Sequence, residues 1–456
     1  MYENKTFHMI GIGGISMSGI AKILLSFNAK VTGSDIAESK ITKELIELGA
    51  NISYGHNPEM IDNADVVIYT AAIAEDDLEL VAAKKQNKKV FERAEFLGEL
   101  SKEYTNCLCI AGTHGKSTTT SMVSLIFLEA SKNPTIQVGA MLSQINGNTY
   151  IGSKDYLIME SCEFVDSFLH FHPTSAIVLN VDNDHLDYFK NLDNIKKSFK
   201  SFLNLLPSDG FAIVNNDDEN SKTIYDETKA TIVSYAIEND ANYKADNIKV
   251  DDFGFYTFDI YKDNNFLVNI KLNIHGKHNI YNALAAVALS NKYIDDTEAI
   301  KKGIESYKGV GRRFEFITKY KGALVFDDYA HHPTEINATL NSVKEIKHNK
   351  SWAVFQSHTF SRTKDHLDEF ADILSKFDNV VIAKIYPARE VNTFNVSEDM
   401  LVDKIKVTNK NVVYIDNFDD IVSYLDEHIE KNDLVVTIGA GPINEVAYKL
   451  KENSEE

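Results

Sequence analysis

The chain has 456 residues, a length that suggests about three domains. Hydrophobic residues make up 44% of it and charged residues 25%, a composition that excludes an intrinsically disordered protein. The formal net charge of -20 argues against binding to nucleic acid or to an anionic membrane, because such binding needs a basic face.

Apolar runs are all shorter than the roughly 18 residues that a membrane span requires. The first residues also lack the apolar segment of a signal peptide. We therefore expect a cytoplasmic protein without membrane insertion. The three cysteines form no C-x-x-C pair, so neither a disulfide framework nor a zinc site is indicated.

Strand-like and helix-like stretches alternate in the first segment. Residues 7–12, 30–35 and 64–70 have the apolar pattern of buried strands, and residues 15–27 have the pattern of a helix. This alternation predicts a parallel sheet covered by helices. A polar stretch at residues 101–106 precedes a new strand, so we predict a first domain of residues 1–106.

A glycine-rich loop, Gly11-Ile-Gly-Gly-Ile-Ser16, joins the first strand to the first helix. With Asp35 at the end of the next strand, it suggests a dinucleotide site of the NAD type. Ser16, however, stands where that motif has its third glycine. The loop therefore supports a pyrophosphate site at a helix N-terminus, and a purely structural turn is the alternative.

The second segment repeats the strand and helix pattern, with strands predicted at residues 107–111, 156–159 and 175–180. Residues 254–274 alternate apolar and polar side chains around Asp263-Asn-Asn265, which is typical of an antiparallel hairpin. A predicted helix at 280–290 follows, and the glycine-flanked residues 308–313 indicate a linker. We predict a second domain of residues 107–313.

The stretch Ile110-Ala-Gly-Thr-His-Gly-Lys-Ser-Thr-Thr-Thr120 lies between a predicted strand and a predicted helix. It approaches the phosphate-binding P-loop G-x-x-x-x-G-K-[ST], but Ile110 occupies the position of the first glycine. Backbone amides of the turn and Lys116 are suited to hold phosphates, and the Ser117 hydroxyl is suited to Mg²⁺. An ordinary strand-to-helix turn is the alternative.

Two acidic stretches follow strands of this second domain. Glu160-Ser-Cys-Glu163 comes after one strand and Asp182-Asn-Asp-His185 after the next. Ligands of open α/β sheets bind at the carboxyl ends of strands, so Glu163 and His185 are candidate ligands of a metal or of its water beside Ser117. Taken singly, either residue would more often be a solvated surface residue.

The third segment returns to strand and helix alternation, with strands predicted at residues 323–326, 353–356, 380–384 and 434–438. We predict a third domain of residues 314–456, whose acidic end, residues 451–456, is expected to be disordered. The predicted fold class is α/β with three domains. These are a Rossmann-like N-terminal domain, a central P-loop ATPase-type α/β domain with an added antiparallel hairpin, and a Rossmann-like C-terminal domain.

Histidines and arginines follow the strands of the third domain. They occur in Asp327-Asp-Tyr-Ala-His-His-Pro-Thr-Glu335 and in Gln356-Ser-His-Thr-Phe-Ser-Arg362, while Arg312 and Arg313 lie in the linker. Such side chains are suited to hold carboxylates and phosphates. A structural role, or for His331 and His332 a metal site, is the alternative.

Together these motifs resemble the Mur ligases of peptidoglycan synthesis, whose short phosphate loop has the sequence G-T-[HN]-G-K-[ST]. The resemblance covers nearly the whole chain and includes Gly33-Ser-Asp35, His278-Asn279 with Asn282, Gly311-Arg-Arg-Phe314 and Phe355-Gln-Ser-His358. Within the family, the chain looks most like the branch that adds L-alanine to UDP-N-acetylmuramate.

The resemblance implies an amide synthesis that depends on ATP and Mg²⁺. The lactyl carboxylate of UDP-N-acetylmuramate would be phosphorylated by ATP, and the amine of L-alanine would displace phosphate from the acyl phosphate through a tetrahedral intermediate. A monomer or homodimer is expected. Because the resemblance assigns the N-terminal glycine loop to the UDP moiety, the hypothesis of an NAD site is removed.

The resemblance also implies a role for each motif. Catalysis falls to Lys116, Glu163, His185 and Arg313, and metal binding to Ser117, Glu163 and His185. ATP is expected to be bound by Gly112, Thr113, His114, Gly115, Lys116, Ser117, Thr118, Asn279, Asn282, Arg313 and Asp328. The UDP sugar is expected to be bound by Gly11, Gly13, Gly14, Ser16, Ser34, Asp35, Thr70, Ala71 and His114. The amino acid is expected to be bound by Tyr329, His331, His358 and Arg362.

The chain departs from the family pattern at two places. Glu160-Ser-Cys-Glu-Phe-Val165 stands where many relatives have E-A-D-E-S-D, and His358-Thr-Phe-Ser-Arg362 stands where many have H-R-Y-T-R. Thr359 thus replaces an arginine, and Arg362 is expected to carry most of the contact with the alanine carboxylate. The alternatives are a murein tripeptide ligase of the same family, which attaches a ready-made peptide, and a nucleotide-gated binding protein without catalysis.

Overall fold

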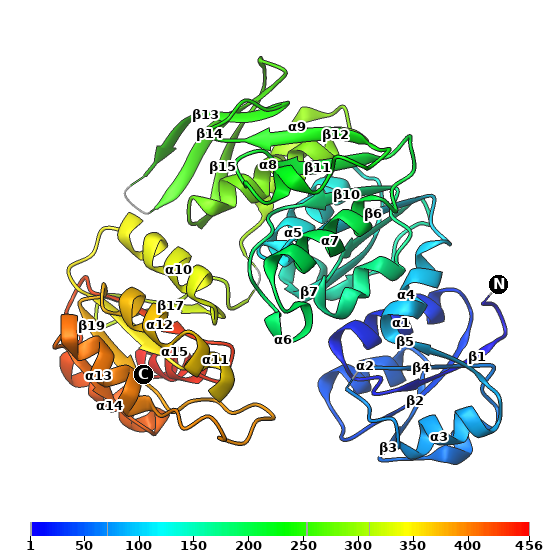
Figure 1. Ribbon diagram of the computed structural model, residues 1–456, viewed down its shortest axis with the longest axis horizontal. Coiled ribbons are helices and arrows are strands. Elements are labelled where there is room, and N and C mark those ends of the chain that lie inside the picture. Colours follow the sequence, from blue (N-terminus) through cyan, green and yellow to red (C-terminus); the bar gives the residue numbers. More distant parts are fainter. Residues whose placement is uncertain (1, 71, 252–253, 310, 456) are drawn as a thin grey trace. The chain divides into compact units, whose positions relative to one another are not determined.

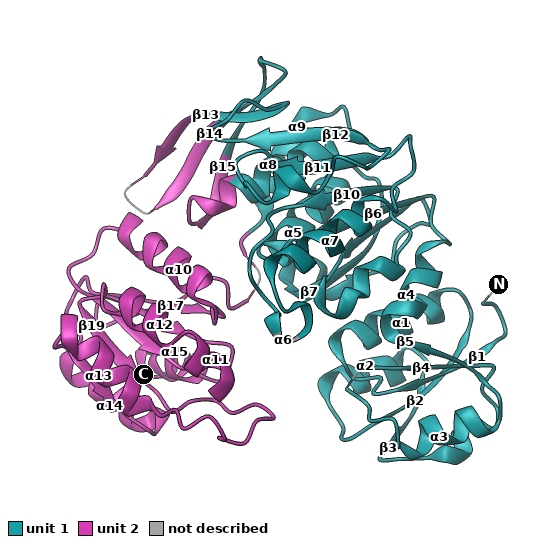
Figure 2. Cartoon of the chain, viewed as in Figure 1, with its two compact units in different colours: residues 1–246, 259–270, 281–307 teal, residues 247–258, 271–280, 308–456 magenta. Residues whose placement is uncertain are grey.

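The computed structural model describes residues 2–70, 72–251, 254–309 and 311–455 (Figure 1). The chain divides into two compact units (Figure 2). One comprises residues 1–246, 259–270 and 281–307, and the other comprises residues 247–258, 271–280 and 308–456.

The N-terminal sheet has five parallel strands in the order β3-β2-β1-β4-β5. The strands are β1 (Thr6–Ile10), β2 (Lys30–Asp35), β3 (Asn51–Tyr54), β4 (Val66–Tyr69) and β5 (Lys89–Glu92), and the helices are α1 (Ile15–Ser26), α2 (Lys40–Glu47), α3 (Leu78–Lys85) and α4 (Arg93–Ser101). The chain leaves β1 toward β2 and β3 and then returns to the other side of β1 at β4. This reversal places the glycine loop after β1 at the switch point where open α/β sheets bind ligands.

The central sheet has ten strands in the order β15-β14-β13-β12-β11-β10-β6-β9-β7-β8. Its strands are β6 (Asn106–Ala111), β7 (Thr135–Leu142), β8 (Gly147–Tyr150), β9 (Tyr156–Glu160), β10 (Ser175–Val178), β11 (Phe211–Asn215), β12 (Thr231–Ala236), β13 (Tyr243–Val250), β14 (Phe255–Lys262) and β15 (Asn265–His275). Its helices are α5 (Lys116–Glu129), α6 (Leu186–Phe189), α7 (Leu192–Leu203), α8 (His278–Ser290) and α9 (Thr297–Ser306). After β6 the chain forms β7, β8 and β9 on one side of β6, and β10 and the later strands lie on the other side. The loop after β6 therefore also lies at a switch point.

The predicted hairpin is confirmed in the central sheet. β14 and β15 are neighbours joined only by Asp263 and Asn264, which have φ values of 47° and 65°. Two consecutive residues with positive φ form the tight turn that matches the twist of antiparallel strands, and asparagine and aspartate tolerate it.

The C-terminal sheet has six strands in the order β16-β17-β21-β18-β19-β20, and only β16 is antiparallel to its neighbour. The strands are β16 (Glu315–Tyr320), β17 (Ala323–Asp328), β18 (Ser351–Phe355), β19 (Asn379–Ile382), β20 (Val412–Tyr414) and β21 (Leu434–Ile438). Helices α10 (Pro333–Glu345), α12 (Leu367–Leu374) and α13 (Glu398–Thr408) share one apolar core with the sheet, and α14 (Phe418–His428) and α15 (Asn444–Glu455) share another. The helices therefore cover both faces, as predicted for a Rossmann-like domain.

Most strand predictions are confirmed to within a few residues, and residues 30–35 and 434–438 match β2 and β21 in full. The prediction of disorder at residues 451–456 is wrong for residues 451–455, because α15 continues to Glu455, and Glu456 lies outside the described residues. The preceding part of the helix is anchored by Val446, Ala447 and Leu450, which are buried against the sheet. The domain boundaries at 106/107 and 313/314 stay predictions. Among the described residues, no helix is both long and apolar enough to cross a membrane.

Candidate active site

The phosphate loop, residues 112–115, is fixed between β6 and the segment that follows β10. The backbone amides of Thr113 and His114 donate to the carbonyl and side-chain oxygens of Asn180 over 3.1 and 2.8 Å, and the Asn180 amide nitrogen donates back to the His114 carbonyl over 3.1 Å. Asp182 donates its backbone N–H to the Thr113 hydroxyl over 2.9 Å. Asn180 is a functional support that the sequence motifs did not reveal.

Two glycines allow the loop to take its course. Gly112 and Gly115 have φ values of 139° and 86°, which side chains rarely adopt. A Cβ at Gly112 would lie 2.8 Å from the Leu179 Cβ, and one at Gly115 would lie 2.5 Å from the Asn282 side-chain oxygen. The loop is therefore packed tightly below the start of α5, and the Asn282 side chain of α8 lies against it.

Lys116 folds its ammonium back over this loop. Its Nζ donates to the carbonyls of Gly112 and Thr113 over 2.6 and 3.0 Å and to the two carboxylate oxygens of Glu163 over 2.9 and 3.2 Å. Burial alone lowers the pKa of Lys116, but the charge and the hydrogen bond of Glu163 outweigh it, so the pKa is raised. The ammonium is thus charged at any physiological pH and is held at the mouth of the loop.

The segments that carry Glu163 and His185 are tied to each other. The rings of Phe164 and His185 lie 4.6 Å apart, and the Tyr188 hydroxyl donates to Asp166 over 2.6 Å. Ser198 of α7 also donates to Asp166. Since Asp166 has a φ of 56°, a conformation that costs energy for most residues, these bonds define the turn that positions Glu163.

The predicted metal ligands are only partly assembled. Glu163 is 2% exposed and paired with Lys116, while His185 lies on the neighbouring loop with its side chain 29% exposed. Within the described part of the chain, no cluster of three or more His, Cys, Asp or Glu residues is arranged to hold a metal ion. This donor set suits Mg²⁺, which usually takes one or two protein ligands and completes its shell with phosphate oxygens and water.

The glycine loop of the N-terminal domain is closed by Asp35. The Asp35 carboxylate accepts the backbone N–H groups of Gly13 and Ile36 over 2.7 and 2.8 Å, and a Cβ at Gly13 would lie 2.8 Å from that carboxylate. Thr70 packs against Gly11, where an added Cβ would meet its methyl group at 2.8 Å. Ala71, also assigned to the UDP sugar, lies outside the described residues.

Ser34 and Ser16 are engaged in different ways. Ser34 is buried and donates to Glu79 over 2.5 Å, and Glu79 also accepts the Asn57 N–H and lies 3.4 Å from the His8 Nε2. Ser16 stands at the start of α1, where its hydroxyl accepts from Arg93 over 3.2 Å. Glu79 is a buried support of the loop that no motif indicated.

The linker residues Arg312 and Arg313 both lie by the ring of Tyr329, with guanidinium carbons 5.0 and 5.5 Å from its centroid. Arg312 also pairs with buried Asp327 at 2.9 Å. Burial raises the pKa of Asp328 to about 6, although the Thr339 hydrogen bond and the charge of Arg313 act in the opposite direction. The side chain of Arg313 is 39% exposed and that of Arg312 is 22% exposed, so Arg313 is the more accessible of the two cations.

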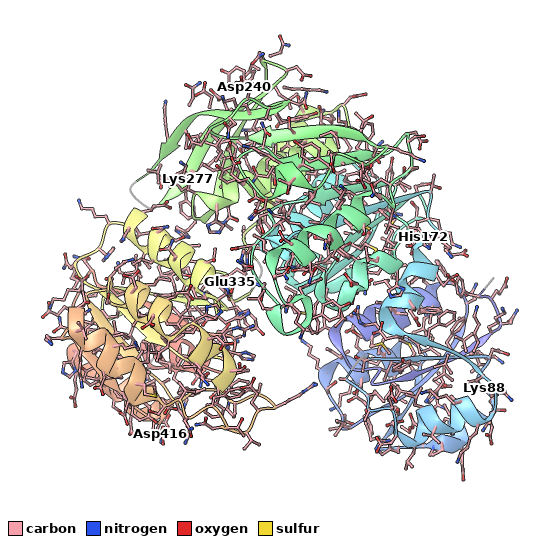
Figure 3. The ribbon with its side chains drawn as sticks, viewed as in Figure 1. Lys88, His172, Asp240, Lys277, Glu335 and Asp416 are labelled. Carbon is pink, nitrogen blue, oxygen red and sulfur yellow. The ribbon has the colours of Figure 1, made fainter. Side chains whose placement is uncertain are left out.

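His331, His358 and Arg362 are brought together as predicted. The two imidazole rings lie 5.9 Å apart, and Arg362 Nη1 lies 3.2 Å from His358 Nδ1. Glu335, labelled in Figure 3 near the start of α10, accepts the His331 backbone N–H over 3.0 Å and lies 3.4 Å from His331 Nδ1. Arg362 belongs to the short helix α11 (Phe360–Asp365), so this helix sets its position.

The turn into α11 is strained and is supported by a residue that the sequence did not single out. Thr359 has φ 68° and ψ 150°, a region that β-branched residues rarely occupy. Glu390 accepts the Ser361 N–H over 2.9 Å and also accepts a hydrogen bond from the Ser361 hydroxyl. Burial opposes its ionisation, but these bonds hold the pKa of Glu390 below its ordinary value.

The phosphate-loop motif after β6, the glycine loop after β1 and the cluster of His331, His358 and Arg362 occur together in the three-part α/β fold of an ATP-dependent ligase of the Mur type. Three family models match the chain in order. They are "Mur ligase family, catalytic domain" over residues 6–105, "Mur ligase middle domain" over 110–290 and "Mur ligase, glutamate ligase domain" over 312–441. The chain belongs to the Mur ligase family.

Individual members of the family are similar to the chain over nearly its full length. The chain is 48% identical over 442 residues to a UDP-N-acetylmuramate–L-alanine ligase of Caldicellulosiruptor bescii, covering 97% of each chain. It is 46% identical to the ligase of the same name from Caldanaerobacter subterraneus, covering 99% of this chain and 98% of the relative. The crystal structure of a UDP-N-acetylmuramate-alanine ligase from Thermotoga maritima matches with a TM-score of 0.82, 26% identity and 99% coverage of both chains.

A murein peptide ligase from Psychrobacter arcticus also has this fold. Its structure matches with a TM-score of 0.68 and 23% identity, covering 98% of each chain. At that identity the match extends to the fold alone.

Proposed function

We propose that this protein joins L-alanine to the lactyl carboxylate of UDP-N-acetylmuramate, with ATP converted to ADP and phosphate, in the synthesis of peptidoglycan precursors. The observation that carries the substrate assignment is the 48% identity over nearly the full length of a ligase named for this reaction. The phosphate loop with Lys116 and the cluster around His358 supply what the chemistry needs.

The chemical task explains the two kinds of site. A carboxylate is a poor electrophile, and phosphorylation turns one of its oxygens into part of a good leaving group. The amide N–H groups at the start of α5 and the Lys116 ammonium are suited to hold the β- and γ-phosphates and to neutralise charge during the transfer. Asn282 at Gly115, and Asn279 one turn earlier on α8, are assigned to the adenine side of the nucleotide.

Lys116 must share its ammonium between the phosphates and Glu163. In the structure its hydrogen bonds go to Glu163 and to loop carbonyls. An incoming phosphate oxygen would replace part of this set and leave Glu163 with a free carboxylate oxygen. We assign that oxygen, Ser117 and His185 to Mg²⁺, which when bound would supply charge neutralisation at the transferring phosphoryl group.

The remaining assignments follow the domains. The loop of Gly11, Gly13, Gly14 and Ser16, with Asp35 and Thr70, is assigned to the UDP sugar, and His114 to both nucleotides. Ser34 is assigned an indirect role, since its hydroxyl is already bonded to Glu79. Arg313 and Asp328 are assigned to ATP, and Tyr329, His331, His358 and Arg362 to L-alanine. The cytoplasmic location and a monomeric or homodimeric state stay predictions.

The proposal is tested by phosphate release from ATP. We expect release only when UDP-N-acetylmuramate and L-alanine are both present, because turnover of the acyl phosphate requires the amine. Appreciable release with ATP alone would contradict a ligase, and release that requires a free tripeptide in place of L-alanine would identify the recycling reaction instead.

A further inference from the structure

Hydrogen bonds fix the position of the ring proton on both imidazoles of the amino-acid cluster. His358 Nδ1 lies 3.2 Å from Arg362 Nη1, and a guanidinium only donates. His358 Nδ1 is therefore an acceptor, and in a neutral ring the proton is on Nε2. His331 Nδ1 lies 3.1 Å from the Tyr329 carbonyl oxygen, which only accepts. His331 Nδ1 therefore carries the proton, and its Nε2 carries a lone pair.

Both rings are neutral near pH 7. Burial is the main cause that lowers the pKa of His358, to about 4, and repulsion from Arg362 and from His331 whenever that ring is protonated adds to it, while Glu390 opposes it. Burial also lowers the pKa of His331, helped by Arg362 and Arg313 and opposed by Glu335 and by the Tyr329 carbonyl. The opposite tautomers of the two rings are thus their working states.

Opposite tautomers match the two ends of an amino acid. The Nε2–H of His358 beside the Arg362 guanidinium offers donors to a carboxylate. The Nε2 lone pair of His331, whose ring is 5.9 Å from that of His358, offers an acceptor to an ammonium. Among the described residues, neither Nε2 atom has a protein hydrogen-bond partner, and the side chain of His331 is 21% exposed.

We propose that His331 is the general base that takes a proton from the ammonium group of the amino-acid substrate. This role rests on the proposed ligase function. Proton transfer to Nε2 produces a neutral amine and an imidazolium, whose charge is stabilised by Glu335 at 3.4 Å from Nδ1.

The amine lone pair forms the new C–N bond at the acyl-phosphate carbonyl, and the bond from that carbon to the phosphate oxygen breaks. The second proton leaves the nitrogen with the departing phosphate, which is released as hydrogen phosphate. His331 returns its proton to solvent before the next cycle.

The test separates base catalysis from binding by changing the nucleophile. Hydroxylamine is largely neutral at pH 7, so its attack on the acyl phosphate does not require a base to remove an ammonium proton. His331→Asn retains a donor near the position of Nδ1 but lacks the Nε2 lone pair. We expect this variant to lose about 10²- to 10⁴-fold in kcat for L-alanine at pH 7 and to keep hydroxamate formation from UDP-N-acetylmuramate, ATP and hydroxylamine.

A second readout is the pH dependence. The deficit of His331→Asn should shrink as pH rises and the amine of free L-alanine becomes neutral by itself. His332→Asn is the matched control, because His332 caps α10 and asparagine is a good cap residue, so both reactions should be unchanged.

Three results would overturn the assignment. Equal loss of amide and hydroxamate formation in His331→Asn would indicate a role in folding or in acyl-phosphate formation. A raised KM for L-alanine with unchanged kcat would reduce His331 to a binding residue. If the parent enzyme forms neither product, the proposed function itself fails, and the base assignment fails with it.

Discussion

Removal of the Lys116 ammonium should affect stability as well as catalysis. The lysine makes its bonds to Glu163 in a setting where the glutamate side chain is 2% exposed and the lysine side chain 14% exposed. Lys116→Met would leave that carboxylate without a counter-ion, and breaking a buried pair costs about 3–5 kcal/mol. We expect this loss in the free energy of unfolding, although phosphoryl transfer is the activity that disappears.

The double-mutant cycle sharpens the prediction. Glu163→Gln on the Lys116→Met background removes the unpaired charge, so the double variant should be more stable than Lys116→Met alone. Urea unfolding followed by circular dichroism measures the four stabilities. UDP-N-acetylmuramate binding, measured by calorimetry, should be nearly unchanged in the folded variants, because the nucleotide sugar is assigned to the N-terminal domain.

Two outcomes would refute the reasoning. Equal stability of Lys116→Met and the parent would mean that the ion pair does not form in solution. Loss of UDP-N-acetylmuramate binding in the folded Lys116→Met variant would mean that the division of labour between the two glycine loops is wrong.

Three further predictions concern the substrate cluster and the N-terminal loop. Arg362→Lys keeps the charge but loses the planar fork, and it should cost roughly 1.5–3 kcal/mol, or about ten- to a hundredfold in kcat/KM for L-alanine. The KM values for ATP and nucleotide sugar should be unchanged. An unchanged alanine KM would place the carboxylate site elsewhere, with His358 and His331 the next residues to replace. Glu390→Ala should release the strained turn at α11 and raise the KM for L-alanine roughly fivefold, which corresponds to the ~1 kcal/mol of a lost cap. Glu390→Gln should have a KM between those of the parent and Glu390→Ala. Equal KM values for all three proteins in steady-state kinetics would exclude a supporting role of Glu390. Burial alone would raise the pKa of Glu79, but its hydrogen bonds from His8, Ser34 and Asn57 outweigh burial, so the folded-state pKa is lowered. The stabilising contribution of Glu79 is therefore present above its unfolded pKa of about 4.3 and is lost as pH falls through the folded-state pKa. Urea midpoints between neutral pH and pH 2 should therefore fall more steeply for the parent than for Glu79→Gln, and parallel curves would contradict this linkage.

The sequence predicted those parts of the fold that local patterns specify. β2 and β21 are short apolar or mixed runs bounded by turn residues, and their limits were predicted in full. The prediction for residues 451–456 fails because these charged and polar side chains show no apolar pattern, while the helix that reaches Glu455 is anchored by the preceding residues Val446, Ala447 and Leu450, which lie on one helical face.

In the candidate site too, residues within one local motif can be predicted from the sequence, and supports from distant loops cannot. Gly112, Gly115 and Lys116 stand in one short motif, so their joint position follows from the chain itself. Glu390 and Asn180 act on residues 29 and 66 positions away, through loops without periodicity, and only the folded arrangement brings these partners together. Such supports carry no local signal, because any acceptor of suitable length at the right place in space would serve.

The amine that the enzyme joins to its nucleotide sugar distinguishes the proposed reaction from the recycling reaction. The most direct measurement is a competition in which ATP, Mg²⁺ and UDP-N-acetylmuramate are incubated with an equimolar mixture of deuterium-labelled L-alanine, unlabelled D-alanine, glycine, L-serine and the free peptidoglycan tripeptide, followed by mass analysis of the nucleotide product. We predict that the mass of the product corresponds to the addition of L-alanine. A product that carries the tripeptide, or ADP formation without any amide product, would contradict the assignment.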